Sequence, residues 1–167
     1  MDELFSKERS VPTQFVKEID GIPIFIKRED LLHPVVSGNK FRKLKYNLQK
    51  AISQGKNTVL TFGGAYSNHI PATAQACKIC GLQSIGVIRG EELAADFEKT
   101  VEQNETLKFA VSCGMKLVFV SRKQYREKNS ERVLEQLGQM YGDFYPVPEG
   151  GTNALAVKGC EEILTEK

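Results

Sequence analysis

The stretch SGNKFRKL, from Ser37 to Leu44, carries the most promising reactive side chain of the sequence, the amine of Lys40. A lysine amine becomes nucleophilic toward an aldehyde when partial desolvation or a nearby positive charge lowers its pKa. Lys43 supplies such a charge one helical turn further on. Apolar residues recur at helical spacing from Phe41 onward and leave both lysines on the opposite side. The pattern marks Lys40 as a candidate attachment point for an aldehyde.

The stretch FGGAYSNH, from Phe62 to His69, has the pattern of an anion-binding turn, in which a strand, two glycines and a polar cluster open a helix. Ser67 and Asn68 add side-chain donors to the free N–H groups of the helix N-terminus. The alternative is that Ser67 only caps the helix. The G-x-G-x-x-G spacing of dinucleotide-binding turns is absent.

The stretch PEGGTN, from Pro148 to Asn153, repeats this arrangement after a later strand. Ligands of open parallel sheets bind beyond the carboxyl ends of the strands. Two such loops in one sheet therefore favour a polar ligand at that edge. Glu149 lies between proline and glycine and is expected to be solvated.

Several other polar features have simpler interpretations. His69 could act as a general base, although a lone histidine beside a helix start is more often a local hydrogen-bonding residue. The charged stretches KREDLLHP (27–34) and 122–135 are expected to be a solvated loop and an exposed helix face. Cys77 and Cys80 form a C-x-x-C pair at the end of a helix, where packing is favoured over redox chemistry. Neither histidine has suitable spacing for a zinc site, so we expect no metal.

The pattern of elements predicts an α/β fold. Two short alternating runs joined by Asp20-Gly21 predict a β-hairpin. From Lys40 onward, helices alternate with short apolar strands, which predicts an open parallel sheet of about four strands with helices on both faces. The expected strands and helices follow as residue ranges: strands 58–62, 84–88, 116–120 and 144–147; helices 40–54, 68–80, within 92–114, from Ser130 to Gly142, and 153–164.

Composition is that of a soluble globular protein of 167 residues, 41% hydrophobic and 26% charged. The formal charge of +2 and the lack of dense basic runs argue against nucleic acid as a partner. No apolar run is long enough to span a membrane and the first residues hold no hydrophobic signal core, so we expect a cytoplasmic protein.

Four motifs in order, KRED-L, S-GNK-x-RKL, FGG-x-x-SNH and P-x-GG-T-N, resemble the 1-aminocyclopropane-1-carboxylate deaminase and D-cysteine desulfhydrase family. Its members are pyridoxal-phosphate enzymes of the tryptophan synthase β-subunit fold. The resemblance implies β-elimination or ring-opening deamination of a small amino acid, which yields a 2-oxo acid and ammonia. It also implies a homodimer.

The resemblance implies a role for each matching residue. Lys40 would form the internal aldimine with pyridoxal phosphate, Lys43 would approach the phosphate, and Asn68 would hydrogen-bond the phenolic oxygen of the cofactor. Ser67, together with Asn68, would bind the substrate carboxylate, and in the deaminases Ser67 would act as a nucleophile or proton shuttle. His69 and Tyr66 would also face the substrate, and Tyr66 replaces the glutamine common in the family.

Family members are about twice as long, and their phosphate-cradling loop lies in the second half. The resemblance therefore implies an N-terminal half: a large-domain segment with the lysine loop (1–46), a small α/β domain (47–150) and a helix returning to the large domain (151–167). An exposed apolar face would then favour oligomerisation. The alternative hypothesis is a non-catalytic small-domain fragment or ligand-binding module that cannot retain the cofactor.

Overall fold

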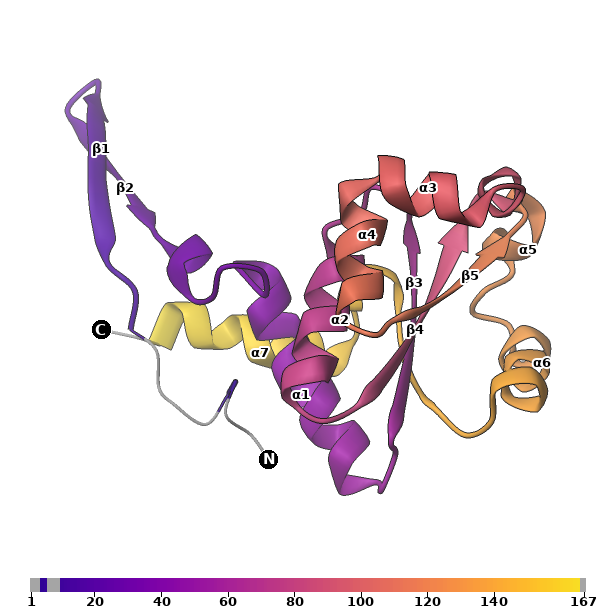
Figure 1. Ribbon diagram of the computed structural model, residues 1–167. Helices are drawn as coiled ribbons and strands as arrows, with labels where there is room; N and C mark the ends of the chain where they lie inside the picture. The colour runs from indigo at the N-terminus through magenta and orange to yellow at the C-terminus, as the bar shows by residue number, and fades with distance from the viewer. Residues whose placement is uncertain (1–3, 6–9, 166–167) are drawn as a thin grey trace.

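The computed structural model describes residues 4, 5 and 10–165, and it contains a four-stranded parallel sheet and a separate hairpin. Figure 1 shows the hairpin standing away from the body that holds the sheet. The strands are β1 (Thr13–Ile19) and β2 (Ile22–Lys27) in the hairpin, and β3 (Thr58–Gly64), β4 (Gln83–Arg89), β5 (Lys116–Val120) and β6 (Tyr145–Val147) in the sheet.

The sheet has the strand order β5-β4-β3-β6, with every neighbouring pair parallel. In the register of the central pair, Val59 lies opposite Ser84 and Phe62 opposite Val87. The short strand β6 carries Pro146 and lies at an edge, as expected for a residue without an N–H group. The carboxyl ends of all four strands consequently meet at one side of the sheet.

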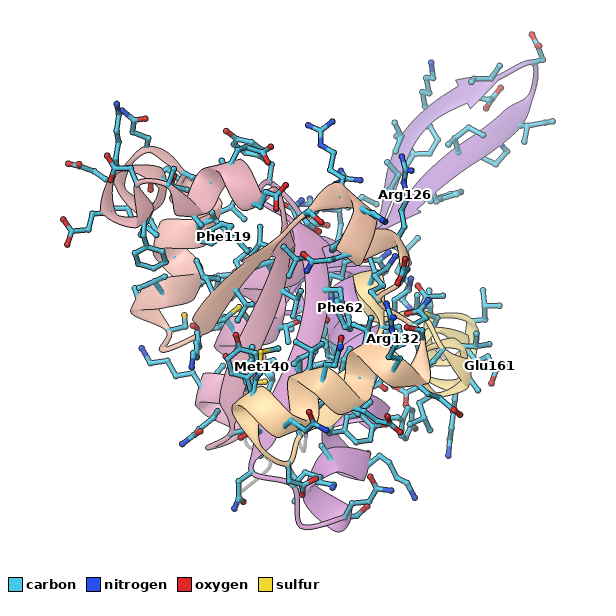
Figure 2. The ribbon with its side chains drawn as sticks, turned by 90° about the vertical axis from the view of Figure 1, so that its right-hand side faces the viewer. Phe62, Phe119, Arg126, Arg132, Met140 and Glu161 are labelled. Atoms are coloured by element: carbon cyan, nitrogen blue, oxygen red, sulfur yellow. The ribbon has the colours of Figure 1, made fainter. Side chains whose placement is uncertain are left out.

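Helices cover both faces of the sheet, which confirms the predicted three-layer fold (Figure 1). On one face, Val59 and Ile88 pack against α1, α2 and α4; on the other, Leu60, Val87 and Leu137 join the core beneath α5 and α6. Figure 2 looks onto the second face, where α6 lies across the strands. The helices are α1 (Asn39–Ser53), α2 (His69–Ile79), α3 (Phe97–Gln103), α4 (Glu105–Ser112), α5 (Arg122–Arg126), α6 (Glu131–Tyr141) and α7 (Ala154–Thr165), with short 3-10 turns at Glu29–Leu31, Glu91–Ala94 and Glu149–Gly151.

Two expected helical regions differ from the structure. The region 92–114 is divided, because Asn104 has an extended backbone and its side chain accepts a hydrogen bond from the Leu107 N–H at 3.0 Å, which starts a new helix. The region 122–135 forms two helices rather than one exposed face. Tyr125 of α5 is only 4% exposed, because it faces Phe62 of the sheet.

The sequence suggested a solvated loop for the charged KRED stretch, but the structure shows that part of it is held by buried contacts. The carboxylate of Glu29 binds the guanidinium of Arg42 through two bonds of 2.9 and 3.0 Å, and Arg42 is 4% exposed. Arg42 also contacts Glu162 of α7 at 3.1 Å, and the carbonyl of Glu29 accepts a hydrogen bond from the Gly38 N–H. We call Glu29, Arg42 and Glu162 the arginine clamp, because they tie the loop before α1 to α1 and α7.

The hairpin side chains are exposed along both strands, apart from half-buried Lys27 at its end. They include Phe15 and Phe25, whose rings pack edge to face, and a further group of aliphatic residues: Val16, Ile19, Ile22, Ile24 and Ile26. The prediction of an exposed apolar face is therefore confirmed for this segment. The division of the chain into three domain segments stays a prediction.

Candidate functional site

Lys40 lies in the first turn of α1, directly after a loop whose backbone conformation at position 38 favours glycine. Gly38 has φ +56° and ψ −139°, a conformation that L side chains rarely adopt. The Lys40 amine is half-buried and donates a hydrogen bond to the Asn39 side chain at 3.0 Å. Burial, and then the positive charge of Lys43, lower the pKa of this amine. Its neutral, nucleophilic form is therefore more populated than that of an ordinary lysine.

A cavity of about 610 Å³ brings Lys40 together with Asn68. Its walls come from the loop before α1, the start of α2 and one side of α4, where Phe109 contributes an apolar surface. A volume of this size suits a cofactor or a small metabolite. We call it the lysine cavity.

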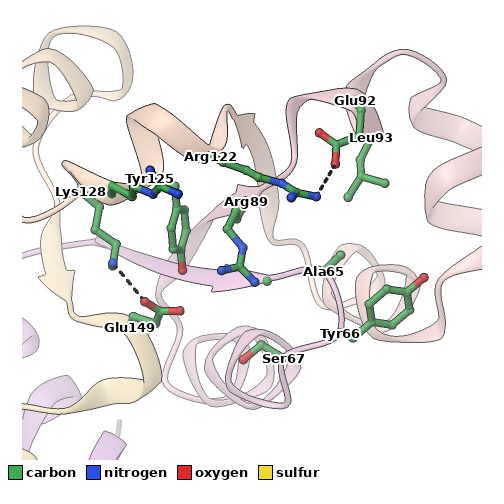
Figure 3. A pocket seen from close by; sticks show the side chains of 12 residues that line it. Ala65, Tyr66, Ser67, Arg89, Glu92, Leu93, Arg122, Tyr125, Lys128 and Glu149 are labelled. Atoms are coloured by element: carbon green, nitrogen blue, oxygen red, sulfur yellow. Dashed lines mark ion pairs between the residues drawn. The ribbon is translucent and has the colours of Figure 1, made fainter.

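Ser67 and Tyr66 line a second cavity of about 860 Å³, at the carboxyl ends of β3 and β4. Ser67 Oγ accepts a long bond of 3.4 Å from the His69 N–H, and Tyr66 is 81% exposed. Consecutive residues of the β3–α2 loop thus serve two cavities, with Asn68 in the first and Ser67 in the second. Figure 3 shows this second cavity, which we call the arginine cavity after Arg89, Arg122 and Arg126.

Lys43 joins α1 to the second glycine loop. Its amine donates a hydrogen bond to Thr152 Oγ1 at 2.9 Å. Gly151 has φ +74° and is buried so closely that an added Cβ would lie 3.4 Å from the Cβ of Lys43. Since β6 pairs with β3, the two glycine loops lie at neighbouring strand ends, as the sequence predicted.

His69 is 1% exposed and is held from two sides. The Thr61 hydroxyl donates a hydrogen bond to the Val147 carbonyl at 2.9 Å. Since a hydroxyl has one proton, His69 Nε2–H is the donor in the 2.7 Å hydrogen bond to Thr61 Oγ1. Burial, followed by the charges of Lys40 and Lys43, lowers the pKa of His69 to about 4. The ring is therefore neutral near pH 7 and ties the start of α2 to β3 and β6, in agreement with the local hydrogen-bonding interpretation.

The cysteines are free thiols, and Cys77 and Cys80 are buried core residues, as expected. Burial raises the pKa of Cys77, which makes its thiol unreactive. Among residues 4, 5 and 10–165, no three histidine, cysteine or acidic side chains form a group that could hold a metal ion. The described helices include none that is long and apolar enough to cross a membrane.

Sequence reasoning missed most of the arginine cavity. Arg89 ends β4, Tyr125 lies within a charged run, and Glu149 forms an ion pair with Lys128 at 3.1 Å rather than facing solvent alone. The available signal was Arg89, because a charged residue that follows a buried parallel strand marks the edge of the sheet where ligands bind.

Comparison with known proteins places this geometry in context. A candidate 1-aminocyclopropane-1-carboxylate deaminase of Thermotoga maritima is 34% identical, over 95% of this chain and 50% of the relative. The bifunctional D-cysteine desulfhydrase/1-aminocyclopropane-1-carboxylate deaminase, mitochondrial, of Arabidopsis thaliana is 33% identical, over 88% and 37%. The chain is homologous to these proteins. It spans about half the length of the curated relatives it matches.

Solved structures agree with this homology. The crystal structure of an ACC deaminase homologue superimposes with a TM-score of 0.71 at 29% identity, covering 96% of this chain and 49% of the other. A hydrogen sulfide-producing enzyme from Fusobacterium nucleatum shares the fold, with a TM-score of 0.58 at 19% identity, over 86% of this chain and 46% of that enzyme. No protein-family model matches the chain. The family resemblance predicted from the four motifs is thereby confirmed.

Proposed function

We propose that this chain provides the cofactor lysine and the substrate-binding turn of a pyridoxal-phosphate-dependent deaminase or lyase. The substrate would be a small amino acid and the products a 2-oxo acid and ammonia. The names of the homologues support this proposal. The observation that carries it is the half-buried Lys40 amine of lowered pKa, which shares a cavity with Asn68.

The residues of the lysine cavity, together with Lys43 on the same helix as Lys40, fit pyridoxal phosphate. Lys40 would hold the cofactor covalently, Asn68 would hydrogen-bond its phenolic oxygen, and Lys43 would face its phosphate. Gly151 lies beside the stem of Lys43 in a backbone conformation of φ +74° that L side chains rarely adopt, so glycine suits the close approach of this loop to α1. When bound, the cofactor supplies an electron sink for the negative charge that develops at the substrate α-carbon.

The chain's own groups would then act in the following way. The desolvated amine of Lys40 would accept and return a proton at Nζ, which its lowered pKa favours. Ser67 and the first turn of α2 would bind the substrate carboxylate, because the N-terminal end of a helix favours negative charge. His69 is buried and neutral, so its part would be to hold the turn in place rather than to exchange protons. Direct contact of His69 or Tyr66 with substrate stays a prediction.

A second candidate function is a small-domain module that does not retain the cofactor. The exposed apolar side chains of the hairpin favour it, because they show that part of the chain lacks a packing partner within the described residues. We propose in addition that the whole protein is a cytoplasmic homodimer.

Binding of pyridoxal phosphate to the purified 167-residue chain tests the leading proposal against the second one. The visible absorbance band of the lysine-bound cofactor should appear with the natural chain and disappear with Lys40→Ala. Lys50→Ala is the matched control, because Lys50 is an exposed lysine of the same helix. Equal bands for Lys40→Ala and the control would reject the assignment of Lys40 and favour the module.

A further inference from the structure

The arginine cavity collects positive charge beyond what its acidic residues can neutralise. Arg89 comes from the end of β4, and three further basic residues come from α5 and the turn after it: Arg122, Arg126 and Lys128. Among the described residues that line the same space, two are acidic, Glu92 and Glu149. Four cations therefore surround a cavity that contains two anions.

The two carboxylates are already engaged with two of these cations. Glu149 pairs with Lys128 at 3.1 Å, and Glu92 pairs with Arg122 at 3.8 Å, as the dashed lines of Figure 3 show. Within the described part of the chain, neither Arg89 nor Arg126 has a carboxylate partner. The cavity thus has two guanidinium groups that remain available to an anion.

Tyr125 adds an observation that is independent of the charges. Tyr125 is 4% exposed. Among the described residues, its hydroxyl is the single buried side-chain polar atom that makes no hydrogen bond. The ring lies between two cations, with the Arg89 guanidinium 5.7 Å and the Lys128 amine 4.6 Å from its centroid. Figure 3 shows the Tyr125 hydroxyl and the Arg89 guanidinium pointing into the same space, on the side of Ser67.

A buried hydroxyl without a partner is rare in folded proteins, and one that faces a cationic cavity is explained by a ligand that accepts a hydrogen bond from it. Burial, and then the carboxylate of Glu149, raise the pKa of Tyr125, so the hydroxyl keeps its proton. Glu149 lies close to the hydroxyl, but it is engaged by Lys128 and does not meet the geometry of a hydrogen bond to Tyr125, so the hydroxyl stays available as a donor. Arginine is well suited to the same ligand, because its planar fork binds carboxylate or phosphate through two parallel hydrogen bonds.

We propose that the arginine cavity is a binding site for a small oxyanion, either a carboxylate or a phosphate group, held by Arg89, Arg126 and the hydroxyl of Tyr125. Ser67 lines the same cavity, so the bound anion would lie next to the predicted substrate turn. Binding does not require the cofactor, because Lys40 and Asn68 line the other cavity.

Titrations of the 167-residue chain followed by ¹H–¹⁵N NMR test this proposal. Succinate and inorganic phosphate are the probes, and succinamide is the neutral analogue of succinate. We expect saturable shifts at the backbone amides of Gly64, Arg89 and Tyr125 with at least one of the anions, and none with succinamide. The anion that binds more tightly identifies carboxylate or phosphate compounds as the source of the ligand.

Variants assign the effect to individual groups. Arg89→Gln should weaken binding by about 10- to 100-fold, the usual effect of removing a charged hydrogen-bond donor. Tyr125→Phe keeps the ring and should weaken binding by about 2- to 10-fold. Glu149→Gln should tighten binding, since it removes a negative charge from the cavity.

Two controls separate this site from general charge effects and from the proposed function. Arg132→Gln removes an exposed arginine of α6 that pairs with Glu127 outside the cavity, and it should leave binding unchanged. Lys40→Ala should bind the anion like the natural chain, whatever its effect on pyridoxal phosphate. The proposal is overturned if succinamide binds as well as succinate, if neither anion shifts these amides, or if Arg89→Gln in a folded chain binds with unchanged affinity.

Discussion

Replacing Arg42 by methionine should lower the free energy of unfolding by about 3–5 kcal/mol, the usual cost of removing one partner of a buried ion pair. Arg42 is 4% exposed, and its side chain donates two hydrogen bonds to the carboxylate of Glu29. The side chain of Glu29 is 14% exposed, so water cannot fully replace the guanidinium. Glu162 suffers less, because Lys45 and Tyr46 also bind it at 2.7 and 2.6 Å.

Urea unfolding followed by circular dichroism measures this loss, with the stability taken from linear extrapolation. Lys45→Met is the matched control, because Lys45 contacts the same carboxylate of Glu162 from a more exposed position and should cost at most about 1 kcal/mol. Adding Glu29→Gln to Arg42→Met should recover part of the loss, since the uncompensated charge is then removed. A loss below about 1 kcal/mol for Arg42→Met would refute the arginine clamp as a stabilising element.

Two further predictions concern the histidine and the helix contact. Because the pKa of His69 is about 4 in the folded chain and about 6.5 in the unfolded chain, the imidazole of the unfolded chain is protonated first as the pH falls. The free energy of unfolding should therefore decrease between about pH 6.5 and pH 4, by up to about 3 kcal/mol. Denaturant unfolding at several pH values should show this slope in the natural chain and a smaller one in His69→Gln; equal slopes would contradict the buried neutral imidazole. Gly159→Ala should destabilise the chain, because an added Cβ would lie 2.0 Å from the Arg42 carbonyl and push α7 away from α1. Gly138→Ala in α6 is the control, because an added Cβ there meets open space and should raise the free energy of unfolding by about 1 kcal/mol through helix propensity. Thermal unfolding compares the stability of the two variants. A Gly159→Ala chain more stable than the Gly138→Ala chain would refute the close α1–α7 contact.

Local signals were sufficient to predict the sheet and most of the helices. The Asp20-Gly21 turn and the glycines that end helices depend on backbone conformations that few residues can adopt. The edge position of Pro146 follows from its missing N–H group. Asn104 was missed because a helix cap in the middle of a helical pattern is visible only from its backbone geometry.

The candidate site was predictable in its residues and less so in its arrangement. The sequence pattern groups Ser67 and Asn68 as one set of donors, yet these neighbours line different cavities, since the chain turns into α2 between them. Tyr125 was hidden in a charged run because a single apolar ring among polar residues gives no periodic signal. The contact of Arg42 with Glu162 joins residues far apart in the chain, which local patterns cannot reveal.

The central claim is that Lys40 is the residue that holds the cofactor, and site mapping tests it most directly. The chain is mixed with pyridoxal phosphate, reduced with borohydride, digested and analysed by mass spectrometry, so that every lysine competes under the same conditions. The account predicts that the pyridoxyl label is concentrated on Lys40, because its amine has a lowered pKa and lies in a cavity. Labelling spread evenly over exposed lysines such as Lys50, with Lys40 unmodified, would contradict it.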